Sequence, residues 1–338
     1  MSKTRYRIIS GAILVSLIIF SFIFLFSSSS SSEGKPLFPG IDALHSREGN
    51  IIIISDTQRT GALEFWREKN FPKTRRLLQE IAERNPAFIA ILGDLTTNGS
   101  SIRNWRFFED AFKPVIENKI PCFPVLGNHD YWGSDKKALR NFTTRFPLMK
   151  DATWYSFTYK RIGFIMLNSN FDNLSDEEIQ KQNKWFREQM DVFENSEEID
   201  FTIACCHHSP YTNSRVISAS EEVRNNFAAP FQKYKKAALF LTGHCHSYEK
   251  FLEGGKYFIV TGGGGGPRQK LEVDKKKRQF NDLFEGPEIR FFHFCEMETI
   301  EKKLILKVWK LNEDDTFSLA DQIEINGVDP LEPGGSTP

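Results

Sequence analysis

Short runs of apolar residues, each ending abruptly in polar side chains, recur along the chain. Five of them cover residues 51–55, 88–92, 123–126, 201–206 and 238–242. A continuous apolar run of this length is typical of a strand buried on both faces of a sheet. Side chains that follow such a strand lie at the edge of the sheet where α/β proteins bind ligands. The pattern therefore predicts a site built from strand ends.

Helical patterns lie between the first three of these strands. Pro72 opens an amphipathic helix that ends before Pro86, and a second amphipathic segment covers residues 102–116. Strands that alternate with helices are usually connected by right-handed crossovers in a largely parallel sheet. We expect such a sheet in the first half of the folded chain.

The second half of the chain carries a different pattern. Residues 154–159 and 162–167 predict two short strands joined as a hairpin at Lys160. Ser175, with Glu178 three residues later, is a capping-box signal for the start of a long amphipathic helix. These elements do not continue the alternation of the first half, which indicates a second sheet.

Three further strands are predicted over residues 257–261, 291–295 and 304–309. Two sheets, each covered by helices, would accommodate all these elements. We therefore expect an α/β fold of two packed mixed β-sheets flanked by helices, a four-layer α/β/β/α sandwich. This domain would cover residues 50–328 and be followed by a flexible tail at residues 329–338.

The amino-terminal end differs from the rest of the chain. A basic flank at residues 1–7 precedes an uncharged apolar run at residues 8–26. As a helix this run would span roughly 28 Å, about the thickness of a bilayer core. Because positive residues stay inside, the pattern predicts a transmembrane signal anchor, a Ser-rich linker at residues 27–49, and a domain on the exported (periplasmic or extracellular) side. Cleavage in the linker would give a secreted protein.

Charge and cysteine content narrow the function classes. Lys and Arg together number 44, as do Asp and Glu, so bulk charge does not predict nucleic-acid binding. The five cysteines have no regular spacing, which excludes a disulfide framework and indicates small buried residues on strands. One disulfide between Cys245 and either Cys205 or Cys206 remains open.

The polar side chains at the strand ends are the oxygen and nitrogen ligands that divalent metals favour. They are Asp56, Gln58, Asp94, Asn128, His207, His244 and His246. Asp56 and Gln58 are two residues apart, as are the last two histidines, so each pair points the same way in an extended segment. The set is large enough for two metal ions, which can clamp the attacking and leaving oxygens of phosphoryl transfer.

Five short motifs carry a resemblance to a known family. They are Asp56-Thr57-Gln58, Gly93-Asp94, Gly127-Asn128-His129-Asp130, His207-His208-Ser209-Pro210-Tyr211 and Gly243-His244-Cys245-His246. In order and spacing they resemble the motifs of the calcineurin-like metallophosphoesterases. The stretch from residue 243 to 250, with the glycine run after it, looks most like the purple-acid-phosphatase-like branch.

The resemblance implies a role for each motif residue. One metal would be held by Asp56, Gln58, Asp94 and His246. The other would be held by Asp94, Asn128, His207 and His244. His129 would contact the phosphate and act as the general acid, and Asp130 would orient it. A hydroxide bridging the two metals would be the nucleophile, which implies a metal-dependent hydrolase of phosphate esters.

Two positions depart from the family pattern. Most relatives carry His where Gln58 stands, and purple acid phosphatases have a tyrosine where this chain has Thr97. No purple Fe(III) centre is therefore expected. An amide oxygen is a harder ligand than imidazole, so we expect Mn, Fe or Mg rather than Zn at the first site.

Three choices stay open. Adjacent strand residues face opposite ways, so one of His207 and His208 binds metal, and the spacing to Tyr211 favours His207. Monoesters are favoured as substrates, with a phosphodiesterase on nucleotides or lipid head groups, or a non-catalytic binding protein, as alternatives. The glycine run at residues 262–266 lacks the lysine of a P-loop, so we expect a turn beside the site.

Overall fold

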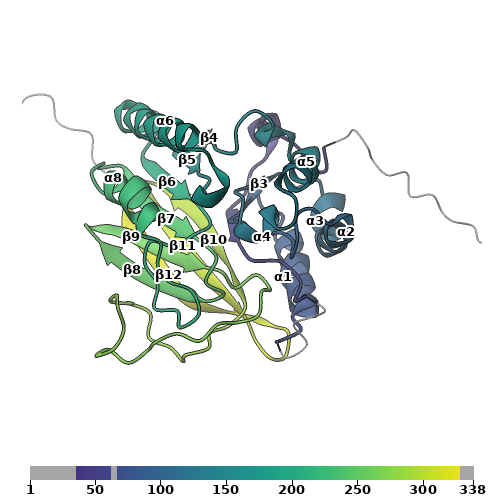
Figure 1. Cartoon of the computed structure of the whole chain (residues 1–338). Helices are drawn as coiled ribbons and strands as arrows, with labels where there is room; N and C mark the ends of the chain where they lie inside the picture. Colours follow the sequence, from purple (N-terminus) through teal and green to yellow (C-terminus); the bar gives the residue numbers. More distant parts are fainter. Residues whose placement is uncertain (1–35, 62–66, 328–338) are drawn as a thin grey trace, which may run out of the picture. The chain divides into compact units, whose positions relative to one another are not determined.

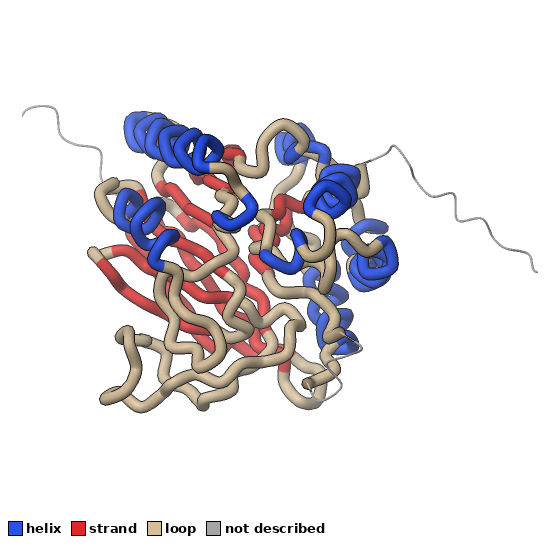
Figure 2. Tube along the Cα trace, viewed as in Figure 1, coloured by secondary structure: helices blue, strands red, loops and turns tan. Residues whose placement is uncertain are grey.

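Two six-stranded β-sheets form the centre of the structure, a computed structural model in which residues 36–61 and 67–327 are described (Figures 1 and 2). The predicted signal anchor at residues 8–26 and the predicted tail at residues 329–338 lie outside the described residues. Within the described part of the chain, every helix is too short or too polar to span a lipid bilayer.

The first sheet has the strand order β12-β11-β10-β1-β2-β3. Its strands are β1 (Ile51–Ile54), β2 (Phe88–Ile91), β3 (Cys122–Pro124), β10 (His293–Ile300), β11 (Lys303–Leu311) and β12 (Phe317–Asn326). The pairs β1–β2 and β2–β3 are parallel, whereas β10 pairs antiparallel with β1 and places Met297 opposite Ile51. The predicted parallel sheet is therefore one half of a mixed sheet.

The second sheet has the order β4-β5-β6-β7-β9-β8. Its strands are β4 (Tyr155–Tyr159), β5 (Ile162–Met166), β6 (Phe201–Cys205), β7 (Ala237–Thr242), β8 (Tyr248–Glu253) and β9 (Lys256–Thr261). Strands β5, β6, β7 and β9 run parallel, and β4 and β8 close the two edges in the antiparallel sense. The predicted hairpin is the pair β4–β5.

Helices flank both sheets. Those that follow the first three strands are α1 (Phe71–Glu83), α2 (Ile102–Ala111), α3 (Lys113–Glu117), α4 (Asn128–Tyr131) and α5 (Asp135–Arg145). Those on the side of the second sheet are α6 (Asp176–Asn195), α7 (Glu221–Val223) and α8 (Ala229–Phe231) (Figure 1). Short helical turns cover Ile41–Ser46, Pro147–Met149, Phe171–Asn173 and Arg224–Ala228. The predicted arrangement of two mixed sheets between helices is confirmed.

The core lies on both faces of each sheet. One apolar cluster joins α1 and α2, the first sheet and the inner face of the second. A second cluster joins the outer face of the second sheet to α6 and α8. Phe88 of β2 meets Phe157 of β4 and Phe164 of β5 edge to face, with ring centroids 5.4 and 5.3 Å apart. Such pairs contribute about 0.5–1.5 kcal/mol each beyond area burial, so they help to hold the sheets together.

Several sequence predictions need correction. The helix predicted over residues 102–116 is two helices, because Pro114 cannot donate a hydrogen bond to the preceding turn and instead lies in the first turn of α3, which starts at Lys113. Strands β8 and β12 were not predicted, since both are edge strands with partly exposed, mixed side chains.

All five cysteines are free and buried, which confirms their predicted place and rules out the disulfide left open above.

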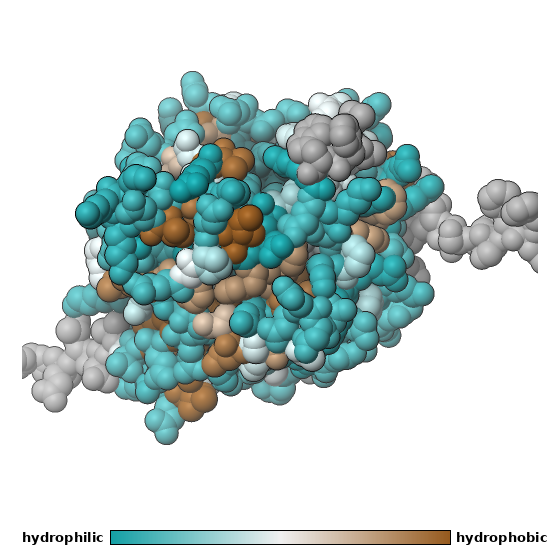
Figure 3. Space-filling view, turned by 90° about the horizontal axis from the view of Figure 1, so that it is seen from below, coloured by the Kyte–Doolittle hydropathy of each residue, from teal (hydrophilic) through white to brown (hydrophobic). Residues whose placement is uncertain are grey.

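The connection between β9 and β10 is long and irregular, and it runs along the lower side of the view in Figure 1. Isolated bridges tie Leu271 to Ser214 and Lys270 to Ile289. Seen from below in Figure 3, the surface is mostly hydrophilic with separate hydrophobic patches. The start of this connection packs beside the end of β7, where Pro267 accepts a hydrogen bond from His246.

Candidate metal centre

The ends of five strands meet at one place between the two sheets. Asp56 follows β1, Asp94 follows β2 and Asn128 follows β3, all in the first sheet. His207 follows β6 and His244 follows β7 in the second. Every predicted metal ligand lies within 3.4 Å of another, so the structure brings all seven together.

Asp94 lies at the centre of the group. Its Oδ2 is 3.2 Å from Nε2 of Gln58, 3.4 Å from Nε2 of His207 and 3.9 Å from Nε2 of His129. Its Oδ1 accepts a hydrogen bond of 2.9 Å from the backbone N–H of His129. The carboxylate therefore touches members of both predicted ligand sets.

Asp56, Gln58 and His246 form the second part of the group. Oδ1 of Asp56 is 3.4 Å from Nε2 of His246, and Nε2 of Gln58 is 3.2 Å from the same nitrogen. Oε1 of Gln58 is buried and has no hydrogen-bond partner among the described residues. The two ends of an amide are assigned from their partners. If the amide is turned the other way, Oε1 faces the carboxylate of Asp94 and the imidazole of His246. A bound cation would satisfy an oxygen in this place, so the residues fit a metal.

Backbone carbonyls fix the orientation of two histidines. Nδ1 of His207 donates to the carbonyl of Leu92 at 2.8 Å, and Nδ1 of His246 donates to the carbonyl of Pro267 at 2.8 Å. In both rings Nε2 is left facing the carboxylates. Metal-binding histidines are usually held in this way, with the second ring nitrogen donating to a carbonyl or carboxylate.

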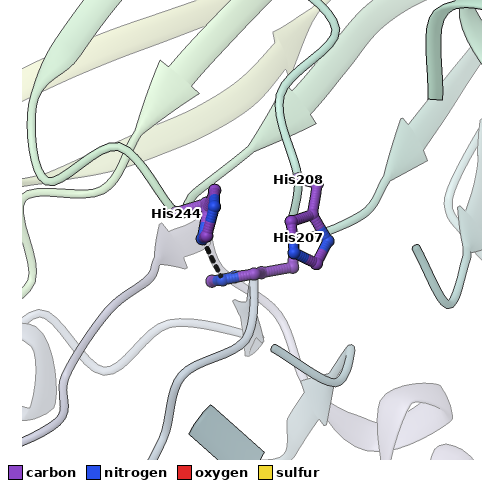
Figure 4. Close-up of side chains that lie close together, drawn as sticks. All are labelled: His207, His208 and His244. Carbon is purple, nitrogen blue, oxygen red and sulfur yellow. Dashed lines mark hydrogen bonds between the residues drawn. The ribbon is translucent and has the colours of Figure 1, made fainter. Parts of the chain in front are cut away.

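Three imidazoles lie close together on the side of the second sheet. Figure 4 shows His207 and His244 facing each other, with Nε2 of the first 3.1 Å from Nδ1 of the second, and the ring of His208 beside them. Nε2 of His207 is also 3.2 Å from Oδ1 of Asn128, whereas Nδ1 of His208 pairs with Oγ of Ser169 at 2.9 Å. The contacts to Asp94 and Asn128 favour His207 over His208 as a ligand.

The backbone is strained at three of the predicted ligands. Asp56, Asp94 and His244 have positive φ angles of 57°, 53° and 67°. Non-glycine residues in this region cost of order 1 kcal/mol or more each, and such residues cluster at functional sites. A Cβ at Gly127 would lie 2.1 Å from Oδ1 of Asp94, so glycine is needed there for the carboxylate to approach. The positive φ angles and the glycine thus let the backbone fit closely around the carboxylates of Asp56 and Asp94.

The electrostatics of the site favour positive charge. Burial alone would raise the pKa of Asp94, but the charges of His207 and His129 hold that pKa well below its usual range. Burial opposes protonation of His207, yet Asp94 raises its pKa to about 9. Burial and the neighbouring His207 hold the pKa of His244 well below the usual value. The buried carboxylates therefore bind cationic charge, which a metal ion would also supply.

His129 and Asp130 are neighbours in α4, and their side chains are held by different partners. Asp130 is buried, and its carboxylate accepts the backbone N–H groups of Leu95, Thr96 and Gly127 at 3.0, 3.2 and 3.0 Å. The ring of His129 is held by Thr97, whose carbonyl lies 3.0 Å from Nδ1. Adjacent helical side chains point about 100° apart, which separates the two groups.

The hydrogen bonds of Asp130 stabilise the loop at residues 95–97, and Thr97 of this loop contacts the ring of His129. Burial raises the pKa of Asp130 to about 8, with the nearby charge of Asp94 acting in the same direction. That Asp130 orients His129 stays a prediction; its carboxylate accepts the N–H groups of Leu95 and Thr96, next to the residue that contacts the ring of His129.

Sequence reasoning missed the backbone partners of the site, since no residue type marks a carbonyl group as a partner. It also missed Trp132, whose ring centroid lies 3.7 Å from that of His129. Its position three residues after His129, directly after the short helix α4, was the available signal. The glycine run lies beside the site, as predicted, but it is a bent segment that pairs with the end of β1, because Gly264 and Gly266 donate their N–H groups to the carbonyls of Ser55 and Asp56.

Comparison with known proteins identifies the motif set. A model of the calcineurin-like phosphoesterase family matches residues 49–248. No curated protein matches the chain in sequence. The matched region contains all the predicted metal ligands and His129.

Solved structures share the fold. A purple acid phosphatase from yellow lupin (Lupinus luteus) seeds has a TM-score of 0.63 and 17% identity, over 82% of this chain and 53% of its own. The anchor protein of the inner membrane complex of Plasmodium has a TM-score of 0.62 and 17% identity, over 84% and 90%. A dimetal phosphatase from Danio rerio has a TM-score of 0.55 and 13% identity, over 86% and 99%. The chain thus spans about half the length of the purple acid phosphatase.

Proposed function

The chain belongs to the calcineurin-like phosphoesterase family and is a metallophosphoesterase, and from this premise we propose that it hydrolyses phosphate monoesters with two divalent metal ions as cofactors. The observation that carries the proposal is the position of Asp94. Its carboxylate lies within 3.4 Å of Gln58 in one ligand set and of His207 in the other. A carboxylate shared in this way suits two neighbouring cations.

Two sets of side chains would hold the metals. The first set is Asp56, Gln58, Asp94 and His246. The second set is Asp94, Asn128, His207 and His244. Bound divalent ions would offset the charge of the phosphate and activate water at neutral pH. The buried, unpartnered Oε1 of Gln58 supports the first set, and the imidazoles that face Asp94 and Asn128 support the second.

His129 is the proposed general acid. A carbonyl oxygen only accepts, so the contact with Thr97 places a proton on Nδ1 and leaves Nε2 to exchange a proton with substrate. The side chain is 19% exposed, and Nε2 lies on the side of Asp94. A phosphate bound beside Asp94 would therefore present its leaving oxygen to this nitrogen.

The oxygen-rich first set favours a hard metal ion. Gln58 provides an amide where an imidazole is usual in the family, so we propose Mn, Fe or Mg at this position. Metal analysis of the protein purified from its native host tests this proposal. Zinc as the sole bound metal would contradict it.

The membrane anchor and the exported location are also proposals. Their support is the apolar run at residues 8–26 and its basic flank. Extraction of cell membranes with alkaline carbonate should leave the protein in the membrane, and protease added outside the membrane should digest its folded domain. Release by carbonate would contradict the anchor.

Monoester hydrolysis is favoured over two alternatives. Two of the solved structures with this fold are named phosphatases, whereas the Plasmodium protein is named an anchor, which keeps a non-catalytic role as the rival. A phosphodiesterase is the alternative enzyme. The position of Nε2 of His129, 3.9 Å from Oδ2 of Asp94, supports catalysis, since a binding protein has no need for a proton donor there.

The decisive experiment is hydrolysis of p-nitrophenyl phosphate and bis(p-nitrophenyl) phosphate by the full-length protein, with Mn²⁺ or a chelator. We expect Mn²⁺-dependent turnover that is faster with the monoester. His129→Ala should lower turnover about a hundredfold or more while the metal stays bound. Metal-loaded, folded protein that turns over neither ester would favour the binding role, and faster diester turnover would favour a phosphodiesterase.

A further inference from the structure

An exposed tryptophan lies directly against the proposed general acid. The ring centroids of Trp132 and His129 are 3.7 Å apart and the rings are inclined by 38°. Trp132 is 49% exposed, although large aromatic side chains are mostly buried in this protein. One part of the indole therefore covers the imidazole, and the rest faces solvent beside the site.

The backbone around Trp132 is held on both sides. Its N–H donates to the carbonyl of His129 at 3.2 Å, and its carbonyl accepts from the N–H of Ser100 at 3.2 Å. The next residue, Gly133, has a φ of 96°, and a Cβ there would lie 1.9 Å from Oγ of Ser100. The loop is thus closely packed, so the indole is presented in a fixed place at little entropic cost.

The position of the indole defines which part of a substrate it can meet. In the proposed reaction the phosphate lies on the side of Asp94, and Nε2 of His129 protonates the leaving oxygen. A group bonded to that oxygen extends away from the phosphate and past the imidazole. The exposed part of Trp132 is the large apolar surface next to His129, and tryptophan faces bind planar aromatic groups by stacking.

We propose that Trp132 is a stacking platform for the leaving group, so that the site prefers phosphate esters whose leaving group carries a planar aromatic ring over esters of wholly aliphatic alcohols. This inference rests on the proposed monoester hydrolysis. The aromatic group is either an aryl ring bonded directly to the leaving oxygen or the base of a nucleoside, since both offer a flat face.

The test compares substrates within each variant. The full-length protein with Mn²⁺ is assayed with phenyl phosphate, adenosine 5′-monophosphate and glycerol 2-phosphate. Trp132→Ala should lower the ratio of kcat/KM for phenyl phosphate over glycerol phosphate about tenfold, which is the size expected for one stacking contact. Trp132→Phe, which keeps a smaller aromatic face, should lower the ratio less. A parallel loss with adenosine monophosphate identifies the base as a second occupant, and no such loss restricts the platform to aryl esters.

Two results would overturn the inference. An equal loss with all three substrates would show that Trp132 only positions His129, and an unchanged ratio would show no contact with the leaving group. Leu252→Ala is the matched control, because Leu252 is 47% exposed and lies on β8 at the sheet edge. A similar fall in its ratio would also overturn the inference.

A binding measurement separates this inference from the proposed function. Calorimetry on the Mn²⁺-loaded protein compares the affinities for phenylphosphonate and methylphosphonate, which cannot be hydrolysed. We expect Trp132→Ala to reduce the preference for phenylphosphonate about tenfold. If no ester is turned over, the proposed activity fails while this preference still decides the role of Trp132.

Discussion

The two sheets contribute different chemistry to one site. The first sheet supplies the predicted oxygen ligands, which are Asp56, Gln58, Asp94 and Asn128. The second supplies the predicted nitrogen ligands, which are His207, His244 and His246. Among the described residues, Asp56 and Asp94 are buried and form ion pairs with histidine but with no lysine or arginine. The site is therefore an interface at which one sheet provides negative charge and the other provides the groups that share it.

The side chains that the two sheets contribute, the oxygen half and the nitrogen half of the site, are also oriented by different means. In the oxygen half, Asp56 and Asp94 are aimed by strained backbone with positive φ. In the nitrogen half, His207 and His246 are aimed by hydrogen bonds to carbonyl groups, and His244 alone of its three histidines has a positive φ. A substitution at Asp56 or Asp94 should thus disturb the chain itself, whereas one at His207 or His246 should mainly remove a predicted ligand.

Removal of the central oxygen ligand should have the largest effect. Asp94→Asn keeps the size of the side chain but removes the charge that both ligand sets share. We expect kcat/KM for p-nitrophenyl phosphate to fall at least about a thousandfold, or about 4 kcal/mol, with loss of bound metal measured by elemental analysis. Asp200→Asn, at a partly exposed ion pair with Arg161, is the control. Full metal content in Asp94→Asn would contradict the shared role.

The nitrogen half is tested by its two adjacent histidines. His207→Ala should weaken metal binding about a hundredfold, because its Nε2 faces Asp94 and Asn128. His208→Ala should weaken it less than about fivefold, since its Nδ1 is engaged by Ser169. Competition with a chelator measures both affinities. The opposite order would assign the ligand to His208.

Much of this division could be predicted from the sequence. Buried parallel strands leave continuous apolar runs, and Asp94 and His244 come directly after a glycine at the end of such runs. The edge strands β8 and β12 left no such run, because their side chains are only partly buried. The partners of Asp130 could not be predicted either, since they are backbone N–H groups whose positions depend on the folded loop.

The second sheet also contains a buried carboxylate outside the site. Its protonation makes the stability of the protein depend on pH. Glu249 of β8 is fully buried and accepts from Oγ1 of Thr212 and the N–H of Asn213. Burial raises its pKa from 4.5 to about 7. The folded protein then binds more protons than the unfolded chain between these values, so this group lowers stability as pH rises from 4.5 to 7.

Glu249→Gln should remove that pH dependence. We expect the wild type to lose roughly 2 kcal/mol of stability relative to the variant between pH 5 and pH 8. Urea unfolding at both pH values measures the difference. An equal change in the two proteins would show that Glu249 is ionised in the folded state throughout.

The smallest expected effect comes from changing one oxygen ligand into a nitrogen ligand. Gln58→His would give the first sheet an imidazole beside Asp94 and His246. We expect the affinity for Zn²⁺ to rise about tenfold relative to that for Mn²⁺, because imidazole is a softer ligand than an amide. Competition between the two ions measures the ratio. No change would show that Gln58 is not a ligand.

The position of β1 has a consequence for the order in which the protein is made. β1 lies between β2 and β10, and Ile51 pairs with Met297 far along the chain. During synthesis the first sheet stays incomplete until β10 has left the ribosome. Every predicted ligand, up to His246, precedes β10 in the chain, so all the donors are already made when the strand that completes the first sheet emerges. Pairing over so long a loop closes late in folding, so we expect the last strands to enclose a site whose side chains are already present.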